Sequence, residues 1–222
     1  MSQNKTAGKA KGGVNGIAVA FAMVGLLVVG LLVGRHYFGP GSQPQGEQAT
    51  AVTAPAIGGP FTLVDQNDNT VTEADFKDRF TLVYFGYTFC PDVCPTALNR
   101  NAEALEILGE QAEKIVPVFI TVDPERDTVA HMKEYVAFFD PRLVGLTGSE
   151  EQVQAAAKAY RVYYAKVKED GAGADADNYL MDHTSITFMM GPDGRFLQHF
   201  SHDATPKDMA KRMREVLAGA GA

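Results

Sequence analysis

Two cysteines, Cys90 and Cys94, stand four residues apart in Tyr-Thr-Phe-Cys-Pro-Asp-Val-Cys-Pro and are the only cysteines in the chain. At the start of a helix, this spacing places both sulfur atoms on one face, on neighbouring turns. The unpaired N–H groups and partial positive charge of a helix N-terminus favour thiolate over thiol. Two such thiolates can close into a disulfide or bind one soft metal ion, so both kinds of site stay open at this point.

The cysteines lie between an apolar run and a helical pattern, which predict the elements that position them. The run over 79–85 predicts a strand buried on both faces, and 95–111 predicts the helix that follows it. A second apolar run, 115–122, predicts the next buried strand. The other expected elements are a hairpin over 61–72, helices over 128–139, 149–159 and 207–217, strands over 143–146 and 161–167, and a closing hairpin over 185–200.

This order of elements predicts an α/β fold with a central mixed sheet flanked by helices. The cysteines then follow a central strand, at the edge where open α/β sheets place their sites. A buried strand, a cysteine pair and a helix form the thioredoxin arrangement, which usually has two residues between the cysteines and a proline before the closing hairpin. This chain has three residues between them and Ser185 in the place of that proline. His183 comes two residues earlier, in a loop expected to face the cysteines.

The N-terminal part of the chain has the pattern of a membrane anchor. The stretch 14–33 holds twenty residues without a charge, which suits one bilayer crossing. A cleaved signal peptide is the alternative, although its apolar region usually runs only about 7–15 residues. Three lysines precede the stretch and only Arg35 follows closely, so the N-terminus is expected in the cytoplasm. We therefore expect a single-pass protein of a bacterial inner membrane, with its folded domain in the periplasm.

Composition divides the chain and limits its partners. The expected parts are a cytoplasmic N-terminus over 1–13, a transmembrane helix over 14–34, a flexible linker over 35–58 and a thioredoxin-like domain over 59–222. The part after Arg35 carries 16 basic and 27 acidic residues, a formal charge of −11. That charge disfavours nucleic acid as a partner, and leaves a basic protein partner or a merely solvated acidic surface.

The chain resembles the Sco/SenC family in five motifs that occur in the same order, from about Phe61 to the C-terminal helix. The motifs are Cys90-Pro-Asp-Val-Cys94-Pro, Thr121-Val-Asp-Pro-Glu-Arg-Asp-Thr128, Leu143-Val-Gly-Leu-Thr-Gly148, Tyr160-Arg-Val-Tyr-Tyr164 and Asp182-His-Thr184. The resemblance implies a membrane-tethered, thioredoxin-like copper chaperone that helps assemble the binuclear copper site of cytochrome c oxidase subunit II. Another periplasmic copper donor is a further partner to expect. The copper ligands that the resemblance implies are Cys90, Cys94 and His183.

The chemistry of these three side chains supports the same expectation. Two thiolates and an imidazole form a soft, three-ligand site suited to Cu(I), and they leave one side open for a recipient's ligands. A closed structural zinc site would have a fourth protein ligand, and the sequence offers no obvious one. Cu(II) would also fit if an oxygen ligand joined, and Asp92 and Asp123 are the candidates for it.

Three other functions use the same cysteines. A thiol-disulfide oxidoreductase would attack with Cys90 and resolve with Cys94, but the missing proline argues against a general reductase. The two roles are compatible, because recipient cysteines must be reduced before they take copper. Val93-Cys-Pro-Thr96 resembles a peroxidase pattern, but the threonine expected three residues before the reactive cysteine is absent. A structural disulfide is the last alternative, although so short a loop constrains the unfolded chain little.

Overall fold

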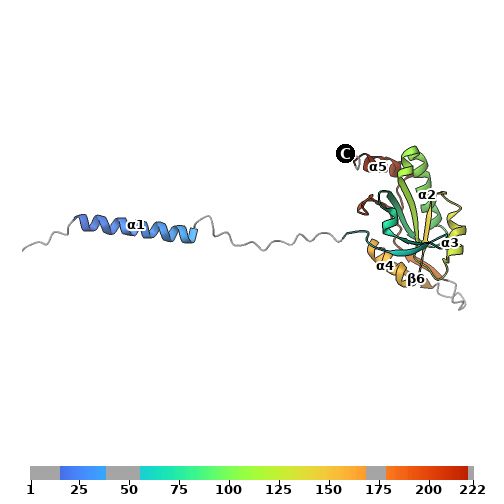
Figure 1. Ribbon diagram of the computed structural model, residues 1–222, viewed down its shortest axis with the longest axis horizontal. Helices are drawn as coiled ribbons and strands as arrows, with labels where there is room; N and C mark the ends of the chain where they lie inside the picture. The colour runs from blue at the N-terminus through green and yellow to red at the C-terminus, as the bar shows by residue number, and fades with distance from the viewer. Residues whose placement is uncertain (1–15, 39–55, 169–178, 220–222) are drawn as a thin grey trace, which may run out of the picture. The chain divides into compact units, whose positions relative to one another are not determined.

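The computed structural model describes residues 16–38, 56–168 and 179–219 (Figure 1). The chain forms two units, Met1–Thr53 and Ala54–Ala222. The described part of the first unit is one helix, α1 (Gly16–Phe38). Within the described residues, no helix combines the length and the apolarity that a membrane crossing requires. The anchor over 14–34 therefore stays a prediction, and the N-terminus over 1–13 and most of the linker lie outside the described residues.

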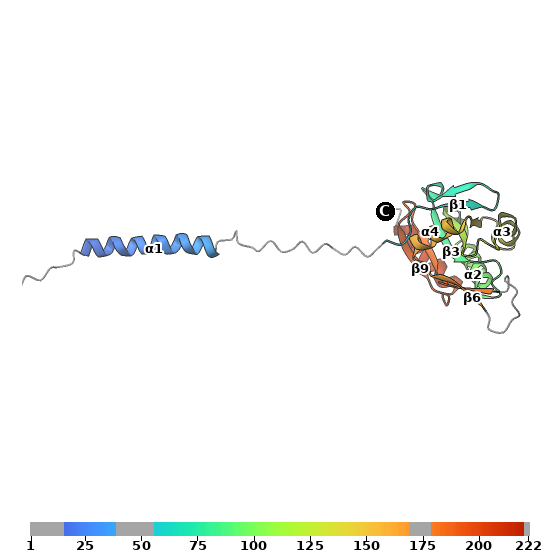
Figure 2. The same cartoon turned by 90° about the horizontal axis from the view of Figure 1, so that it is seen from below.

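The second unit is built on a seven-stranded mixed sheet with the order β2-β1-β5-β4-β3-β8-β9. Its strands are β1 (Thr62–Asp65), β2 (Thr70–Thr72), β3 (Phe80–Gly86), β4 (Ile115–Thr121), β5 (Val144–Thr147), β8 (Thr187–Met190) and β9 (Phe196–Phe200). The central strand β3 runs parallel to β4 and antiparallel to β8. Every residue of β3 and β4 is buried, as their continuous apolar runs predict. Figure 2 shows β1 and β9 toward opposite edges of this sheet.

Helices cover both faces of the sheet, so the predicted α/β fold is confirmed. They are α2 (Val93–Leu108), α3 (Val129–Val136), α4 (Glu150–Tyr160) and α5 (Pro206–Gly219), with short 3-10 turns at Glu73–Phe76 and Gly109–Lys114. Helices α2 and α5 pack side by side, with Leu82 and Met189 in the cluster between them and the sheet. On the other face, Tyr160 of α4 packs against Phe85 at a ring distance of 5.3 Å. Figure 1 shows α4 across the strands from α2 and α5.

The boundaries of two helices follow from local signals. Helix α2 begins at Val93, two residues earlier than predicted. Pro95 fits inside the first turn, because the N–H that proline lacks would have no partner within the helix there. It ends at Leu108 and is followed by Gly109, whose φ of 68° and ψ of −139° suit glycine. Helix α4 begins after Ser149, which forms a reciprocal capping box with Gln152.

A separate two-stranded hairpin carries the histidine singled out in the sequence. Its strands are β6 (Tyr164–Lys168) and β7 (Tyr179–His183), paired antiparallel so that Tyr164 lies opposite His183. The sequence placed His183 in a loop, whereas it is the last residue of β7. Residues 169–178, between the two strands in the sequence, lie outside the described residues.

Candidate metal centre

The chain turns sharply from β3 into α2 through the segment that carries both cysteines. The turn starts at Gly86, where a Cβ atom would lie 2.8 Å from Cys94 Sγ and 2.9 Å from Phe119 Cε2. Glycine is therefore required here to let the sulfur approach the end of the strand. Cys94 lies in the first turn of α2 and is fully buried, whereas Cys90 lies in the preceding loop and is 9% exposed.

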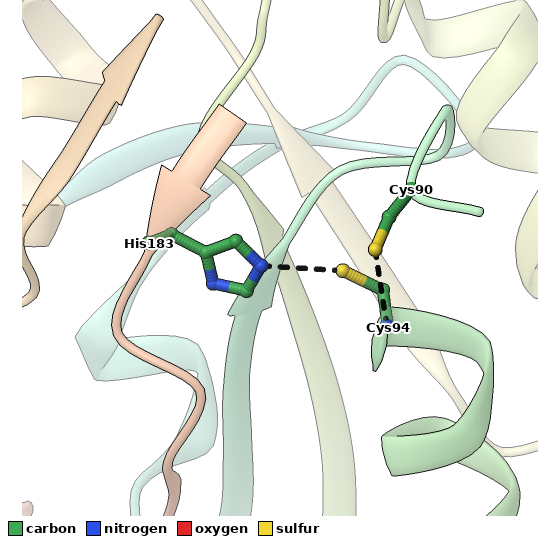
Figure 3. Close-up of side chains that lie close together, drawn as sticks. All are labelled: Cys90, Cys94 and His183. Atoms are coloured by element: carbon green, nitrogen blue, oxygen red, sulfur yellow. Dashed lines mark hydrogen bonds between the residues drawn. The ribbon is translucent and has the colours of Figure 1, made fainter. Parts of the chain in front are cut away.

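Three side chains converge at this point, as the sequence predicted for the two cysteines and the histidine (Figure 3). The ligand atoms of Cys90, Cys94 and His183 all lie within 4.8 Å of one another. Cys94 Sγ is 3.4 Å from His183 Nε2, and the Cys94 N–H donates to Cys90 Sγ at 3.2 Å. Neither cysteine is in a disulfide. No other group of three or more His, Cys, Asp or Glu side chains within the described residues is arranged to hold a metal ion.

The imidazole of His183 is oriented by contacts on its other atoms. Its Nδ1 lies 3.3 Å from the Thr184 carbonyl oxygen. A proton on Nδ1 satisfies that carbonyl and leaves the lone pair of Nε2 directed at the sulfur atoms. The rings of Tyr84 and Tyr87 pack against the imidazole in T-shaped arrangements, with centroids 6.1 Å and 5.9 Å away and interplanar angles of 80° and 90°. These contacts restrain the imidazole beside the sulfur atoms.

Two tyrosines wall the site beside the imidazole. They are Tyr84, inside β3, and Tyr87, in the cysteine loop. Tyr163 is 61% exposed, and Tyr164 is the strand partner of His183. An apolar strand run gives no local sign that one of its side chains contacts a histidine about 100 residues later.

The pKa values of the two cysteines are shifted in opposite directions. The thiol of Cys94 donates to Cys90, and this hydrogen bond lowers the pKa of Cys90 against the opposing effect of burial. The same hydrogen bond, together with burial, raises the pKa of Cys94. Cys90 Sγ also accepts one of the N–H groups left unpaired at the start of α2. The lowered pKa of Cys90 favours a thiolate there, which suits a soft metal ion or an electrophilic sulfur.

The two aspartates predicted as auxiliary ligands lie outside the group of converging atoms. Asp123, two residues after β4, accepts from Arg126 Nε at 2.5 Å and from the Tyr179 hydroxyl at 2.7 Å. The Arg126 guanidinium also lies 3.7 Å from the centroid of the Tyr179 ring. Both oxygens of Asp123 are thus engaged in tying the start of β7 to the segment after β4. Asp92 is exposed at the start of α2, and an oxygen ligand at either position stays a prediction.

Comparison with known proteins places this site in a defined family. A sequence model described as SCO1/SenC matches residues 49–218. An SCO2-like protein of Rickettsia conorii is 44% identical over 158 residues, which cover 71% of this chain and 76% of that protein. The protein SenC of Rhodobacter capsulatus is 43% identical over 163 residues, covering 73% and 72% of the two chains.

Solved structures give the same result. The structure of Bradyrhizobium japonicum ScoI with copper bound has a TM-score of 0.65 and 45% identity, and the match covers 72% of this chain and 99% of that one. Arabidopsis thaliana ScoI with copper bound has a TM-score of 0.68 and 38% identity, over 74% and 99% of the two chains. Both the fold and the sequence of most of the second unit are therefore similar to those of these proteins. The chain belongs to the SCO1/SenC family, as its five motifs predicted.

Proposed function

We propose that this protein binds copper through Cys90, Cys94 and His183 and delivers it to cytochrome c oxidase during assembly of that enzyme. The observation that carries the proposal is the convergence of two sulfur atoms and one nitrogen within 4.8 Å. Structures of relatives 45% and 38% identical to this chain are described as having copper bound. The recipient that fits best is the binuclear copper site of subunit II, as the family resemblance implies.

The donor set favours Cu(I) over the other common metal ions. Thiolate is a soft ligand that selects Cu(I), and imidazole suits copper as well. A structural zinc site would add a fourth protein ligand, and no other His, Cys, Asp or Glu of the described residues joins the group. A three-ligand site holds the ion and leaves a position for an incoming ligand, which is what a delivering protein needs.

The different burial of the three ligands suggests an order in which a recipient's ligands replace them. Cys94 is fully buried, Cys90 is 9% exposed and His183 is half-buried. A recipient's ligands can therefore reach the ion on the side of Cys90 and His183 only. We infer that these two ligands are replaced first and that Cys94 is released last.

The proposed location follows from the N-terminal sequence. The uncharged stretch over 14–34, with lysines before it, supports a single-pass inner-membrane anchor with the N-terminus in the cytoplasm. The copper domain then faces the periplasm, where a second periplasmic protein supplies its copper. Fusing a periplasm-dependent reporter to the C-terminus tests this topology, and an active cytoplasmic reporter at the same position would contradict it.

A second candidate function is the reduction of disulfides in the recipient, and the hydrogen-bonded dithiol favours it. The Cys90 thiolate would attack one sulfur of the recipient's disulfide and form a mixed disulfide. Cys94, losing its proton, would then attack Cys90 and release the second recipient thiol. Two electrons pass to the recipient, and a Cys90–Cys94 disulfide remains.

A Cu(I) titration of the full-length protein tests the first function directly. The reduced protein, in detergent and without oxygen, competes for Cu(I) with a coloured chelator. We expect one copper per chain, and a Cys94→Ser variant that retains little of it. A wild-type protein that leaves all the copper on the chelator would refute the proposal.

A further inference from the structure

A buried carboxylate, Asp127, lies behind the cysteine loop and takes no part in the metal centre proposed above. Its side chain is fully buried and accepts three hydrogen bonds. The Thr88 hydroxyl donates to Oδ1 at 2.6 Å, and the Thr88 N–H donates to Oδ2 at 3.0 Å. The Thr121 hydroxyl donates to Oδ2 at 2.6 Å. A carboxylate removed from water needs such partners, and two of the three come from one residue.

Thr88 is two residues before Cys90, so this carboxylate forms hydrogen bonds to the loop that carries a proposed metal ligand. The contact joins residues 39 positions apart in the chain. Within the loop itself, the Cys90 N–H donates to the Tyr87 carbonyl oxygen at 3.3 Å, which is a longer bond. Asp127 therefore supplies two hydrogen bonds, 2.6 Å and 3.0 Å long, between this loop and the rest of the domain.

Asp127 is itself fixed to the centre of the sheet. Its N–H donates to the Asp123 carbonyl oxygen at 3.0 Å, directly after β4. Its carbonyl oxygen accepts from the Thr147 hydroxyl at 2.7 Å, at the end of β5. The backbone of Asp127 is thus held beside the ends of two neighbouring strands, β4 and β5. Its carboxylate fixes Thr88 relative to these strands.

We propose that Asp127 is a positioning residue that holds Thr88, and through it Cys90, at the distance from Cys94 and His183 that metal binding requires. Side chains that orient metal ligands from behind typically change metal affinity by about 10- to 100-fold when they are removed. A ligand on a loop depends most on such support, because loops are positioned less well than helices or strands. The effect on copper rests on the function proposed above, whereas the effect on the loop does not.

Two substitutions of Asp127 distinguish a positioning role of its hydrogen bonds from an effect of its negative charge. In Asp127→Asn, the amide oxygen can occupy the Oδ2 site and accept from the Thr88 N–H and the Thr121 hydroxyl. The amide NH₂ then faces the Thr88 hydroxyl, which can turn to accept from it. All three contacts survive without the charge. Asp127→Ala loses all three. Thr88→Val keeps the N–H contact and loses the hydroxyl contact, together with the 3.5 Å contact of that hydroxyl with His131 Nε2.

Two measurements on the full-length protein test this inference. The first is Cu(I) affinity by competition with a chelator, and the second is hydrogen exchange of the peptide with Thr88 and Cys90 in the metal-free protein. We expect Asp127→Ala to bind Cu(I) about 10- to 100-fold more weakly and to exchange this peptide faster. Asp127→Asn should restore both values to within about twofold of wild type. Thr187→Val is the matched control for Thr88→Val, because it removes a buried hydroxyl bond, to Asn101 at 3.2 Å, away from the loop.

Each outcome decides the inference. Wild-type affinity and exchange in Asp127→Ala would overturn it, and so would an Asn variant as impaired as the Ala variant. If Asp127→Ala fails to fold, Thr88→Val decides, and values equal to those of Thr187→Val would overturn it. A wild-type protein that binds no Cu(I) would refute the proposed function instead, and hydrogen exchange alone would then test the positioning role.

Discussion

Replacing His183 with alanine separates copper binding from thiol chemistry. The imidazole supplies one of three converging ligand atoms, and its Nε2 lies 3.4 Å from Cys94 Sγ. The hydrogen bond from the Cys94 N–H to Cys90 Sγ does not involve the histidine. We therefore expect His183→Ala to lose copper affinity and to keep most of its dithiol reactivity.

The expected loss of copper affinity in His183→Ala can be worked out from the number of ligands. Metal sites with four protein ligands bind with about 10–16 kcal/mol, which is about 2.5–4 kcal/mol for each ligand. At about 1.4 kcal/mol per tenfold change, the loss of one ligand weakens binding by about two to three orders of magnitude. The lost ring contacts with Tyr84 and Tyr87 cost the fold only about 1 kcal/mol each. The variant should therefore remain folded.

The assay combines a Cu(I) competition titration with the rate of exchange against a small disulfide. His199→Ala is the matched control, because His199 is exposed on β9 and lies outside the group of ligand atoms. The control should bind copper as the wild type does. The thiol exchange rate of His183→Ala should stay within about tenfold of wild type, since the pair of sulfurs is retained.

Equal copper affinity in His183→Ala and wild type would remove the histidine from the site and refute the three-ligand reasoning. A variant that loses copper affinity and thiol exchange together would indicate that the histidine supports the cysteine pair generally. A normal far-ultraviolet circular dichroism spectrum distinguishes either result from unfolding.

Three further predictions concern the surroundings of the site. Gly86→Ala should lower the free energy of unfolding by about 1–3 kcal/mol and weaken copper binding, because the new Cβ would lie 2.8 Å from Cys94 Sγ; denaturant melts and copper titration measure the two effects. Cys90 should react with iodoacetamide at pH 6, because its lowered pKa keeps it a thiolate at pH values where an ordinary thiol is protonated; a rate that falls with pH as in a free cysteine would contradict this. Tyr179→Phe should cost about 1–3 kcal/mol in thermal unfolding, because it removes the 2.7 Å hydrogen bond to buried Asp123; an unchanged melting temperature would contradict it.

Two of these predictions have matched controls elsewhere in the fold. Gly145→Ala also introduces a crowded Cβ, 2.6 Å from Met132 Cγ, but away from the sulfurs. It should destabilise the protein without a change in copper affinity, so a loss of affinity equal to that of Gly86→Ala would refute a local effect. Tyr163→Phe removes a hydroxyl from a side chain that is 61% exposed, and it should leave the melting temperature unchanged.

Much of the fold was predictable because its signals are local. The apolar run over 115–122 corresponds to β4 at Ile115–Thr121, and the closing hairpin predicted over 185–200 corresponds to β8 and β9. The cysteine spacing predicts the start of α2 to within two residues. The histidine was found by its place before this hairpin and by family resemblance, and the structure brings it to the sulfurs.

The contacts that support the site were not predictable, because they join distant parts of the chain. The helix predicted over 128–139 corresponds to α3, which Thr128 caps. The buried contact of Asp127 with Thr88 spans 39 residues and has no local pattern. The same holds for the pairing of β6 with β7, which places His183 at the end of a strand.

The central claim is that two sulfur atoms and one imidazole nitrogen together hold a single Cu(I). The most direct measurement is X-ray absorption of the full-length protein, purified without oxygen under reducing conditions and loaded with one equivalent of Cu(I). We expect one copper per chain with two sulfur neighbours and one nitrogen neighbour, from Cys90, Cys94 and His183. A spectrum with sulfur neighbours alone, unchanged in His183→Ala, would contradict the claim.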